Sequence, residues 1–299
     1  MRSRRIDNSI VAAVKNNDEP TAIREALALL SLNDFTKEDD VVVITANMVN
    51  DNKPDRGVVV GQESLREVIR FFKNRKVKRI VIAAGSGGGQ TKEISDNIGY
   101  EKIYKEEGCQ FIDLNKGPFT ELNLEGNIIK STKINRLIEE ATLMVSFTQL
   151  KSHEEATVSG VIKNIALSWP PAEIHGYPKK NLGIHEDLHD FIFRMASSIP
   201  IDLSILSLSP AMVGTGPSKG IAKRSNMVLA SLDPVSCDTV GADLLGLRPQ
   251  GVSYLYRLIK AGIGEGNIKN ISIKGLKLID MEKEFSKLAY GFEFSLNEE

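Results

Sequence analysis

Short aliphatic and β-branched runs alternate along the chain with amphipathic stretches. Buried parallel strands typically read as such runs followed by a glycine or polar loop, whereas helices carry apolar residues at a spacing of three to four. The pattern predicts strands over 39–49, 77–89, 108–115, 141–153, 200–209, 226–233 and 270–278. It predicts helices over 20–32, 63–76, 95–108, 184–197, 233–245 and 251–261, and an irregular loop over 168–183.

This alternation predicts an α/β fold with mostly parallel sheets and flanking helices, arranged as two Rossmann-like lobes. We expect an N-terminal lobe over 1–150 and a C-terminal lobe over 151–299, with the site at their junction. Ligands bind open α/β sheets beyond the carboxyl ends of the strands. The predicted strand exits at 47–55, 85–91, 150–164 and 209–220 are polar or glycine-rich, so we expect site residues there.

Composition narrows the class of ligand. The 38 Lys and Arg residues nearly cancel the 39 Asp and Glu residues, so no overall field recruits nucleic acid or an anionic membrane, and an anionic ligand must be bound locally. Cys109 and Cys237 lie far apart, which excludes a disulfide framework and an iron–sulfur cluster built from four cysteines. Such cysteine usage predicts a cytoplasmic location, and the interrupted apolar stretches predict no membrane span.

The segment KSHEEATVSGVIKN, residues 151–164, concentrates chemically useful side chains after a predicted strand. All four histidines of the chain also fall between His153 and His189, and imidazole titrates near neutral pH. A histidine at a strand exit facing a lysine of the next helix suits acid–base chemistry on an anionic partner, or its covalent attachment. Ion-paired surface residues are the alternative. We predict catalytic roles for His153, Lys163 and His185, and ligand binding by Lys151, Thr157, Ser159 and Asn164.

Two glycine-rich loops are candidates for anion binding through backbone N–H groups. The first, AAGSGGGQT, contains Gly85, Gly87 and Gly88, and the second, GTGPSKG, contains Gly214 and Gly216. The first is not the dinucleotide fingerprint, because Gln90 takes the place of the third glycine, and no P-loop lysine follows. A flexible turn remains the alternative for both loops.

Two further motifs admit both a catalytic and a structural interpretation. His185, Glu186 and His189 match the H-E-x-x-H pattern of zinc hydrolases, but no histidine follows and the next glutamate is Glu265, so a third ligand is missing. A solvated helix start with one functional histidine is the alternative. In DPVSCD, Asp233 before a proline is typical of a helix N-cap, whereas Asp238 is a weaker candidate for the site.

Four segments in this order resemble the large family called domain of unknown function 362 (DUF362). They are QLKSHEEATVSGVIKN (149–164), the later His185, MVGTGPSKG (212–220) and NMVLASLDPVSCDTVGADLLGL (226–247). Two positions depart from the family pattern: Thr45 and Ala46 replace Lys-Pro, and Ser207 and Leu208 replace Asp-Gly. Many members resemble iron–sulfur proteins through an additional cysteine segment that this sequence lacks.

The chain is also similar, more distantly, to the N-terminal part of nickel-pincer lactate racemases, which have a histidine followed ten residues later by a lysine. His153 and Lys163 have this spacing. The resemblance implies a cofactor tethered to Lys163, and histidines such as His153 and His185 that bind nickel or zinc or move a proton. The catalytic histidine expected near the glycine loop is absent, and Asn50 and Lys53 replace an acid and an arginine.

Together these patterns predict a cleft that binds a small anionic molecule or a nucleotide-like cofactor, with proton transfer of the isomerase or racemase type. The alternative is a non-catalytic protein that delivers a metal or cofactor to a partner. A zinc hydrolase based on His185, Glu186 and His189 is the third possibility.

Overall fold

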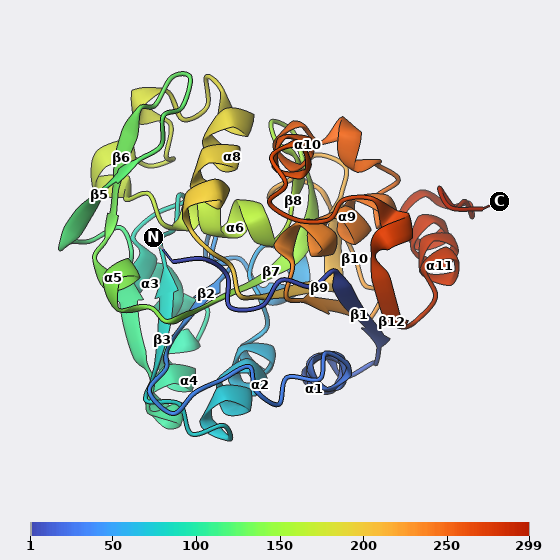
Figure 1. Cartoon of the computed structure of the whole chain (residues 1–299), viewed down its shortest axis with the longest axis horizontal. Coiled ribbons are helices and arrows are strands. Elements are labelled where there is room, and N and C mark those ends of the chain that lie inside the picture. The colour runs from blue at the N-terminus through green and yellow to red at the C-terminus, as the bar shows by residue number, and fades with distance from the viewer. Residues whose placement is uncertain (1, 299) are drawn as a thin grey trace.

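The computed structural model describes residues 2–298, which form one ten-stranded sheet and a separate two-stranded sheet. The large sheet has the order β12-β1-β11-β9-β7-β2-β3-β4, and the short strands β10 and β8 pair with β9 and β7 (Figure 1). The strands of the large sheet are β1 (Ile10–Lys15), β2 (Val41–Ala46), β3 (Arg79–Ala84), β4 (Gln110–Asp113), β7 (Leu143–His153), β8 (Thr157–Ser159), β9 (Leu203–Val213), β10 (Ile221–Lys223), β11 (Met227–Ser231) and β12 (Ser272–Gly275). The antiparallel pair is β5 (Phe119–Asn123) and β6 (Ser131–Asn135).

The core strands β9, β7, β2, β3 and β4 are parallel, whereas β11 is antiparallel to both of its neighbours. This confirms the predicted α/β class with a mostly parallel sheet. Residue 150 falls inside β7, and β7 pairs with β9, so strands of both predicted halves belong to one sheet.

Helices cover both faces of the sheet (Figure 1). They are α1 (Glu19–Leu29), α2 (Gln62–Lys73), α3 (Thr91–Asn97), α4 (Tyr100–Glu107), α5 (Leu137–Glu140), α6 (Val161–Ser168), α7 (Ala172–His175), α8 (Leu188–Ser198), α9 (Pro234–Leu244), α10 (Ser253–Lys260) and α11 (Leu278–Tyr290). Alternate residues of a strand face opposite sides. Thus Val42 and Ile44 pack in one hydrophobic core with α1, α2 and α4, whereas Val43 packs in a second core with α6, α8, α9 and α10.

Six of the seven predicted strands contain an observed strand, and the seventh, 200–209, overlaps β9, which continues to Val213. Five of the six predicted helices correspond to single observed helices. The predicted helix over 95–108 is wrong in one respect: Gly99, at φ 78°, separates α3 from α4. The helix predicted from 184 begins only at Leu188, because residues 184–187 form turns. Asp233 accepts a hydrogen bond from Val235 N (2.9 Å), which confirms the predicted N-cap of α9.

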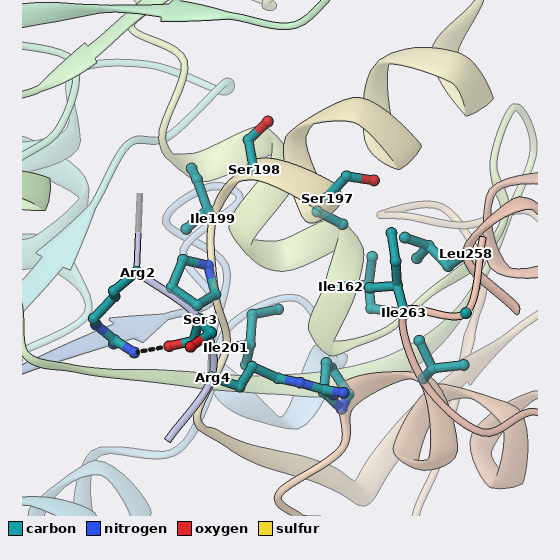
Figure 2. A pocket seen from close by; sticks show the side chains of 15 residues that line it. Arg2, Ser3, Arg4, Ile162, Ser197, Ser198, Ile199, Ile201, Leu258 and Ile263 are labelled. Carbon is teal, nitrogen blue, oxygen red and sulfur yellow. Dashed lines mark hydrogen bonds between the residues drawn. The ribbon is translucent and has the colours of Figure 1, made fainter. Parts of the chain in front are cut away.

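The segment formed by residues 2–5 runs along the amino ends of the parallel strands. Arg2, Ser3 and Arg4 form one wall of a cavity of about 240 Å³, whose other walls come from α6, α8, α9, α10 and the chain before β9 (Figure 2). The charged groups here already have partners: Arg2 pairs with Asp202, and Arg4 pairs with Asp233. The remaining wall is largely apolar, so this cavity offers little for polar chemistry.

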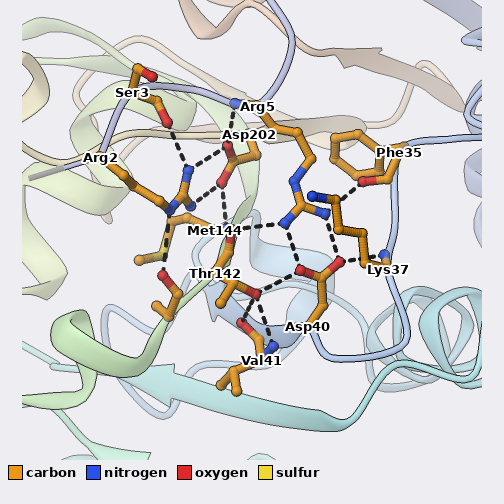
Figure 3. Close-up of polar contacts among 11 residues, drawn as sticks. Arg2, Ser3, Arg5, Phe35, Lys37, Asp40, Val41, Thr142, Met144 and Asp202 are labelled. Carbon is orange, nitrogen blue, oxygen red and sulfur yellow. Dashed lines mark hydrogen bonds and ion pairs between the residues drawn. The ribbon is translucent and has the colours of Figure 1, made fainter.

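Two buried carboxylates fasten the same segment to the starts of β2, β7 and β9 (Figure 3). Asp202 accepts hydrogen bonds from Met144 N (2.7 Å) and Arg5 N (2.9 Å), as well as from Arg2. Asp40 accepts two bonds from the Arg5 guanidinium, at 2.6 and 2.5 Å, and others from Lys37 N and Thr142 Oγ1. The amino edge of the sheet is therefore closed by ion pairs.

We expect Asp40→Asn to lower the free energy of unfolding at neutral pH by removing a contribution that the wild type loses only at acidic pH. Although burial acts to raise the pKa of Asp40, Arg5 and the other donors hold it at about 2, below the ordinary 3.8. A carboxylate with a lowered pKa stabilises the fold above its unfolded pKa, and this contribution, about 2 kcal/mol, is lost as the pH falls from about 4 to 2. Urea unfolding of both proteins at pH 6 and pH 3 measures the difference, which should shrink at pH 3; a constant difference contradicts the assignment.

Candidate functional site

A pocket of about 290 Å³ opens at the carboxyl ends of β2, β3 and β7. Its lining comes from the exits of these strands, from α6, and from the loops that precede α8 and β10. The lining residues are Asn47, Met48, Val49, Asn50, Gly85, Gly87, Gly88, His153, Ser159, Lys163, Asn164, Leu167, Ser168, Pro178, Lys179, His185, Leu188, Pro217 and Ser218. The structure thus brings His153, Lys163 and His185 together at the edge where α/β sheets bind ligands.

The β7–β8 hairpin and α6 explain why the segment 151–164 converges on this pocket. Lys151 and His153 are two residues apart on β7 and therefore face the same side, and Ser159 of β8 pairs opposite Lys151. Helix α6 follows at once and presents Lys163, Asn164, Leu167 and Ser168 on one face, at helical spacing. Thr157 and Ser159 belong to β8, and Gly160, which follows directly, is the N-cap residue of α6.

The cap of α6 comes instead from Asp238 of α9. Its two carboxylate oxygens accept hydrogen bonds from Val161 N (2.8 Å) and Ile162 N (3.1 Å). Burial raises the pKa of Asp238 to about 7, and these two backbone donors oppose the rise. A side chain on Gly160 would place its Cβ 2.1 Å from Asp238 Oδ1, so only glycine permits this cap. Asp238 therefore orients the helix that carries Lys163.

Two of the three lysines at the site are held by protein acceptors. Lys151 donates to Asn47 Oδ1 and Gln149 O, both at 2.9 Å. Lys179 donates to the carbonyls of Gly85 (2.8 Å), Leu167 (2.8 Å) and Ser168 (3.2 Å), and so ties its loop to the glycine loop and to α6. Burial lowers the pKa of each to about 7, and the Lys163 charge contributes for Lys151.

Lys163 differs from these two lysines. Within residues 2–298 its ammonium makes no hydrogen bond or ion pair, and the side chain lines the pocket. Burial lowers the pKa of Lys163 to about 8, and the Glu155 carboxylate partly opposes this shift. A desolvated cation without a partner is costly, and an anion in the pocket would supply the missing interaction.

His153 presents a hydrogen-bond donor to the pocket. Its Nδ1 accepts hydrogen bonds from Glu155 N and Ala156 N, both at 3.1 Å. Burial, together with the nearby Lys163 charge, lowers the pKa of His153 to about 3, so the ring is neutral at pH 7. A neutral imidazole has one proton, and with Nδ1 accepting, this proton lies on Nε2.

His185 has the opposite arrangement, because its Nδ1 contacts the Glu155 carboxylate. The carboxylate accepts the Nδ1 proton, and in the neutral form of the ring the Nε2 lone pair has no donor among residues 2–298. Lys180 pairs with the other oxygen of Glu155 at 3.2 Å. Partial burial acts to raise the pKa of Glu155, but the bonds from His185 and Lys180 lower it overall. The two histidines of the pocket thus offer one donor and one acceptor.

The first glycine loop is a close-packed part of the pocket wall. A Cβ on Gly85 would lie 2.2 Å from Ser168 O, and one on Gly88 would lie 2.5 Å from Val49 O. Ser86 fixes the turn, since its hydroxyl donates to Val49 O and accepts from Gly88 N. Within residues 2–298 the N–H of Gly87 has no acceptor, so it is available to a ligand.

The second glycine loop contributes through its neighbours. Gly214 and Gly216 do not line the pocket, but Pro217 and Ser218 do. Gly216 lies so close to β7 that a Cβ would be 1.9 Å from Ser152 O, which brings the loop against the end of the strand. Of the other predicted binding residues, Thr157 and Lys151 are absent from the pocket lining, although Lys151 reaches it through Asn47.

Sequence reasoning missed Glu155, Lys179 and Asn47. Glu155 lies in the segment 151–164, but its spacing predicts no role, and Lys179 lies in the predicted irregular loop over 168–183. No spacing in the sequence signals that Lys179 folds back over the glycine loop. Asn47 had a signal, since it lies at the predicted strand exit 47–55 and directly follows Thr45 and Ala46, which depart from the family pattern.

The zinc-hydrolase interpretation of His185, Glu186 and His189 does not fit the structure. The pattern requires both histidines on one helix, but His185 precedes α8. His185 contacts Glu155, whereas His189 accepts a hydrogen bond from Tyr254 N and stacks on that ring. His175, the fourth histidine, bonds to Thr132 in the core.

The described residues also fail to match the predicted nickel or zinc site at His153 and His185. Across residues 2–298, no three His, Cys, Asp or Glu side chains are grouped closely enough to hold a metal ion. In addition, Nε2 of His153 carries a proton and Nδ1 of both rings is already bonded. We therefore derive no step through a metal.

The departures from the family pattern have structural roles. Thr45 accepts a hydrogen bond from Trp169 Nε1 (3.3 Å) through its hydroxyl, and its carbonyl accepts one from Asn164 (2.9 Å). Ser207 donates to Glu19 of α1 on the other side of the sheet. Neither residue lines the pocket.

A family model for the domain of unknown function DUF362 matches residues 42–243, which span β2 to α9 and hold every residue that lines the pocket. The chain belongs to the DUF362 family. The matched region includes the Asp238 cap, the lysines and both pocket histidines. The resemblance to the DUF362 family that the four sequence segments indicated is thereby confirmed.

Two individual proteins are similar to this DUF362 chain. The thylakoid-associated protein sll1697 of Synechocystis sp. (strain ATCC 27184 / PCC 6803 / Kazusa) is 22% identical over 244 residues, which cover 81% of this chain and 71% of that protein. The lactate racemase apoprotein from Thermoanaerobacterium thermosaccharolyticum is 18% identical, with a TM-score of 0.44. The match covers 78% of this chain but spans only 57% of the racemase chain. No helix among residues 2–298 is long and apolar enough to cross a bilayer.

Proposed function

We propose that the pocket binds a small organic anion and transfers a proton to or from it, as isomerases and racemases do. The observation that carries this proposal is the Lys163 ammonium, which lines the pocket without any protein partner in residues 2–298. His153 Nε2–H and the N–H of Gly87 add neutral donors beside it. A half-buried positive charge with convergent donors is complementary to a carboxylate or phosphate.

The size of the pocket favours a small anion over a nucleotide-like cofactor. Sites for drug-sized ligands range from about 300 to 1,000 Å³. At about 290 Å³, this pocket is at the small end of that range. Met48, Leu167 and Leu188 supply apolar contact for a short carbon skeleton.

Proton transfer is assigned to His185. A general base needs a free lone pair, and His185 Nε2 has one because Glu155 fixes the proton on Nδ1. His153 cannot take this role without losing its two backbone donors. In this proposal His153 therefore binds and orients, and His185 accepts and returns the proton.

Calorimetric titration with oxalate and with inorganic phosphate at pH 7 tests anion binding. We expect saturable binding of at least one of them with one site per chain, and shifts of the His153 and His185 imidazole resonances on addition. No saturable binding of either anion, or heat without a change at these two rings, contradicts the proposal.

We expect Glu155→Gln to release the fixed tautomer of His185. The glutamine amide can accept from Nδ1–H or donate to Nδ1, so both tautomers become populated and the Nε2 lone pair is lost in part of the molecules. The ¹⁵N shifts of the imidazole report the tautomer directly. The neighbouring exposed Glu154 offers the matched control Glu154→Gln, and Glu186→Gln offers a second, since neither carboxylate contacts His185. An unchanged tautomer in Glu155→Gln refutes the orienting role.

A further inference from the structure

The unpartnered amine of Lys163 is a potential nucleophile as well as a charge. Lys151 and Lys179 hold their protons in hydrogen bonds to two and three acceptors, whereas the Lys163 amine is bonded to nothing in residues 2–298. It lies on the pocket wall together with His185, whose Nε2 lone pair is free. An amine and a general base that line the same pocket are the groups that imine formation requires.

We propose that Lys163 forms an imine with a small carboxylate that carries an aldehyde or ketone carbon, and that His185 exchanges the proton on the adjacent carbon. This inference rests on the proposed function, because it requires the anion to bind first. It goes further by naming the reacting bond and the class of substrate.

The carboxylate of such a substrate has donors within the pocket. His153 Nε2 is a hydrogen-bond donor, because Nδ1 accepts two backbone hydrogen bonds and the ring proton therefore lies on Nε2. The Ser159 hydroxyl lines the pocket and makes no hydrogen bond within the described residues. Both belong to the β7–β8 hairpin, so they hold the acid group on one side while α6 presents Lys163.

The covalent step balances without an oxidant or a reductant. Neutral Lys163 Nζ attacks the carbonyl carbon, and its surplus proton passes through His185 Nε2 to the carbonyl oxygen, which becomes the carbinolamine hydroxyl. His185 then takes a second proton from solvent and gives it to this hydroxyl, which leaves as water, so that a protonated imine remains. The lowered pKa of Lys163, about 8, leaves roughly one amine in ten neutral at pH 7.

The protonated imine acidifies the neighbouring C–H bond, because the electron pair released there is accepted by the positive nitrogen. His185 Nε2 takes the proton and forms an enamine, and return of the proton restores the imine. Water then releases the carbonyl compound and the free lysine. This sequence is a route to the proton transfer of the proposed function.

Trapping with 2-oxobutyrate and sodium cyanoborohydride tests the imine. We expect a saturable adduct that peptide mass spectrometry locates at Lys163, formed faster as the pH rises toward 8. Lys163→Arg is the matched variant, because it keeps the positive charge and removes the nucleophile. It should lose the saturable adduct, and circular dichroism together with urea unfolding shows that the variant is folded.

Deuterium exchange gives a second readout. The C3 protons of 2-oxobutyrate in D₂O should exchange faster with the wild-type protein than with Lys163→Arg or His185→Gln. Adduct and exchange rates equal in Lys163→Arg and the wild type overturn the inference. If the wild type nevertheless binds oxalate, only the imine is refuted and the proposed anion site stands. If the wild type does not bind oxalate, the proposed function itself is refuted.

Discussion

Replacing Asp238 by alanine is expected to lower the free energy of unfolding by about 3–5 kcal/mol, through loss of two hydrogen bonds to a buried carboxylate. The side chain is completely buried and bonds to the first two N–H groups of α6. Without it these donors have no acceptor, and water cannot replace it unless the packing of α6 on α9 loosens. Urea unfolding measures the loss.

Two controls separate this cap from a general effect of removing an acid. Asp238→Asn keeps one oxygen acceptor and should lose less than the alanine variant. Asp187→Ala removes the N-cap of α8, which is partly exposed, and should cost about 1 kcal/mol. Equal decreases in the free energy of unfolding for Asp238→Ala and Asp187→Ala would contradict the prediction that the buried α6 cap stabilises the fold more than an exposed cap.

Lys163→Gln is expected to weaken oxalate binding about 10- to 100-fold, the worth of one charge-assisted hydrogen bond. Glutamine has similar length and can still donate a hydrogen bond, so the loss isolates the charge. Because the pKa of Lys163 is lowered to about 8, the lysine is mostly charged at pH 7 and loses its charge as the pH rises. Wild-type affinity should therefore fall between pH 7 and pH 9, and the Lys163→Gln affinity should change less.

Lys102→Gln is the matched control for the charge, since Lys102 lies on α4 with its side chain 75% exposed. It should bind oxalate like the wild type at each pH. A Lys163→Gln protein that binds as tightly as this control contradicts the anion site. Circular dichroism of both variants checks that the helices are intact.

The strands and the approximate place of the site follow from local patterns in the sequence. Buried aliphatic runs predicted β2, β3, β7 and β9, and the strand-exit rule led to His153 and the glycine loop at Gly85. Such patterns involve neighbouring residues, so a single sequence contains them. The Asp233 cap was found for the same reason.

The contacts that complete the site join distant parts of the chain and have no local signature. Lys179 reaches Gly85 across 94 positions, and Asp238 caps a helix that begins 77 positions earlier. The role of His185 depends on Glu155, whose partner no periodicity identifies. The predicted helix start at 184 was wrong because acids near a helix N-terminus do not fix the residue at which the helix begins.

The pairing of β7 with β9 constrains how a ligand enters. These strands come from the two halves of the sequence, and their ladder continues from Val145 to Gln149 before the register shifts near Lys151. A hinge that separates the halves would have to break this ladder in the middle of the sheet. Any movement that accompanies ligand entry is therefore expected in the short segments around Pro178 and Pro217, which line the pocket outside this ladder. The rates of ligand binding and release should respond to substitutions in these segments.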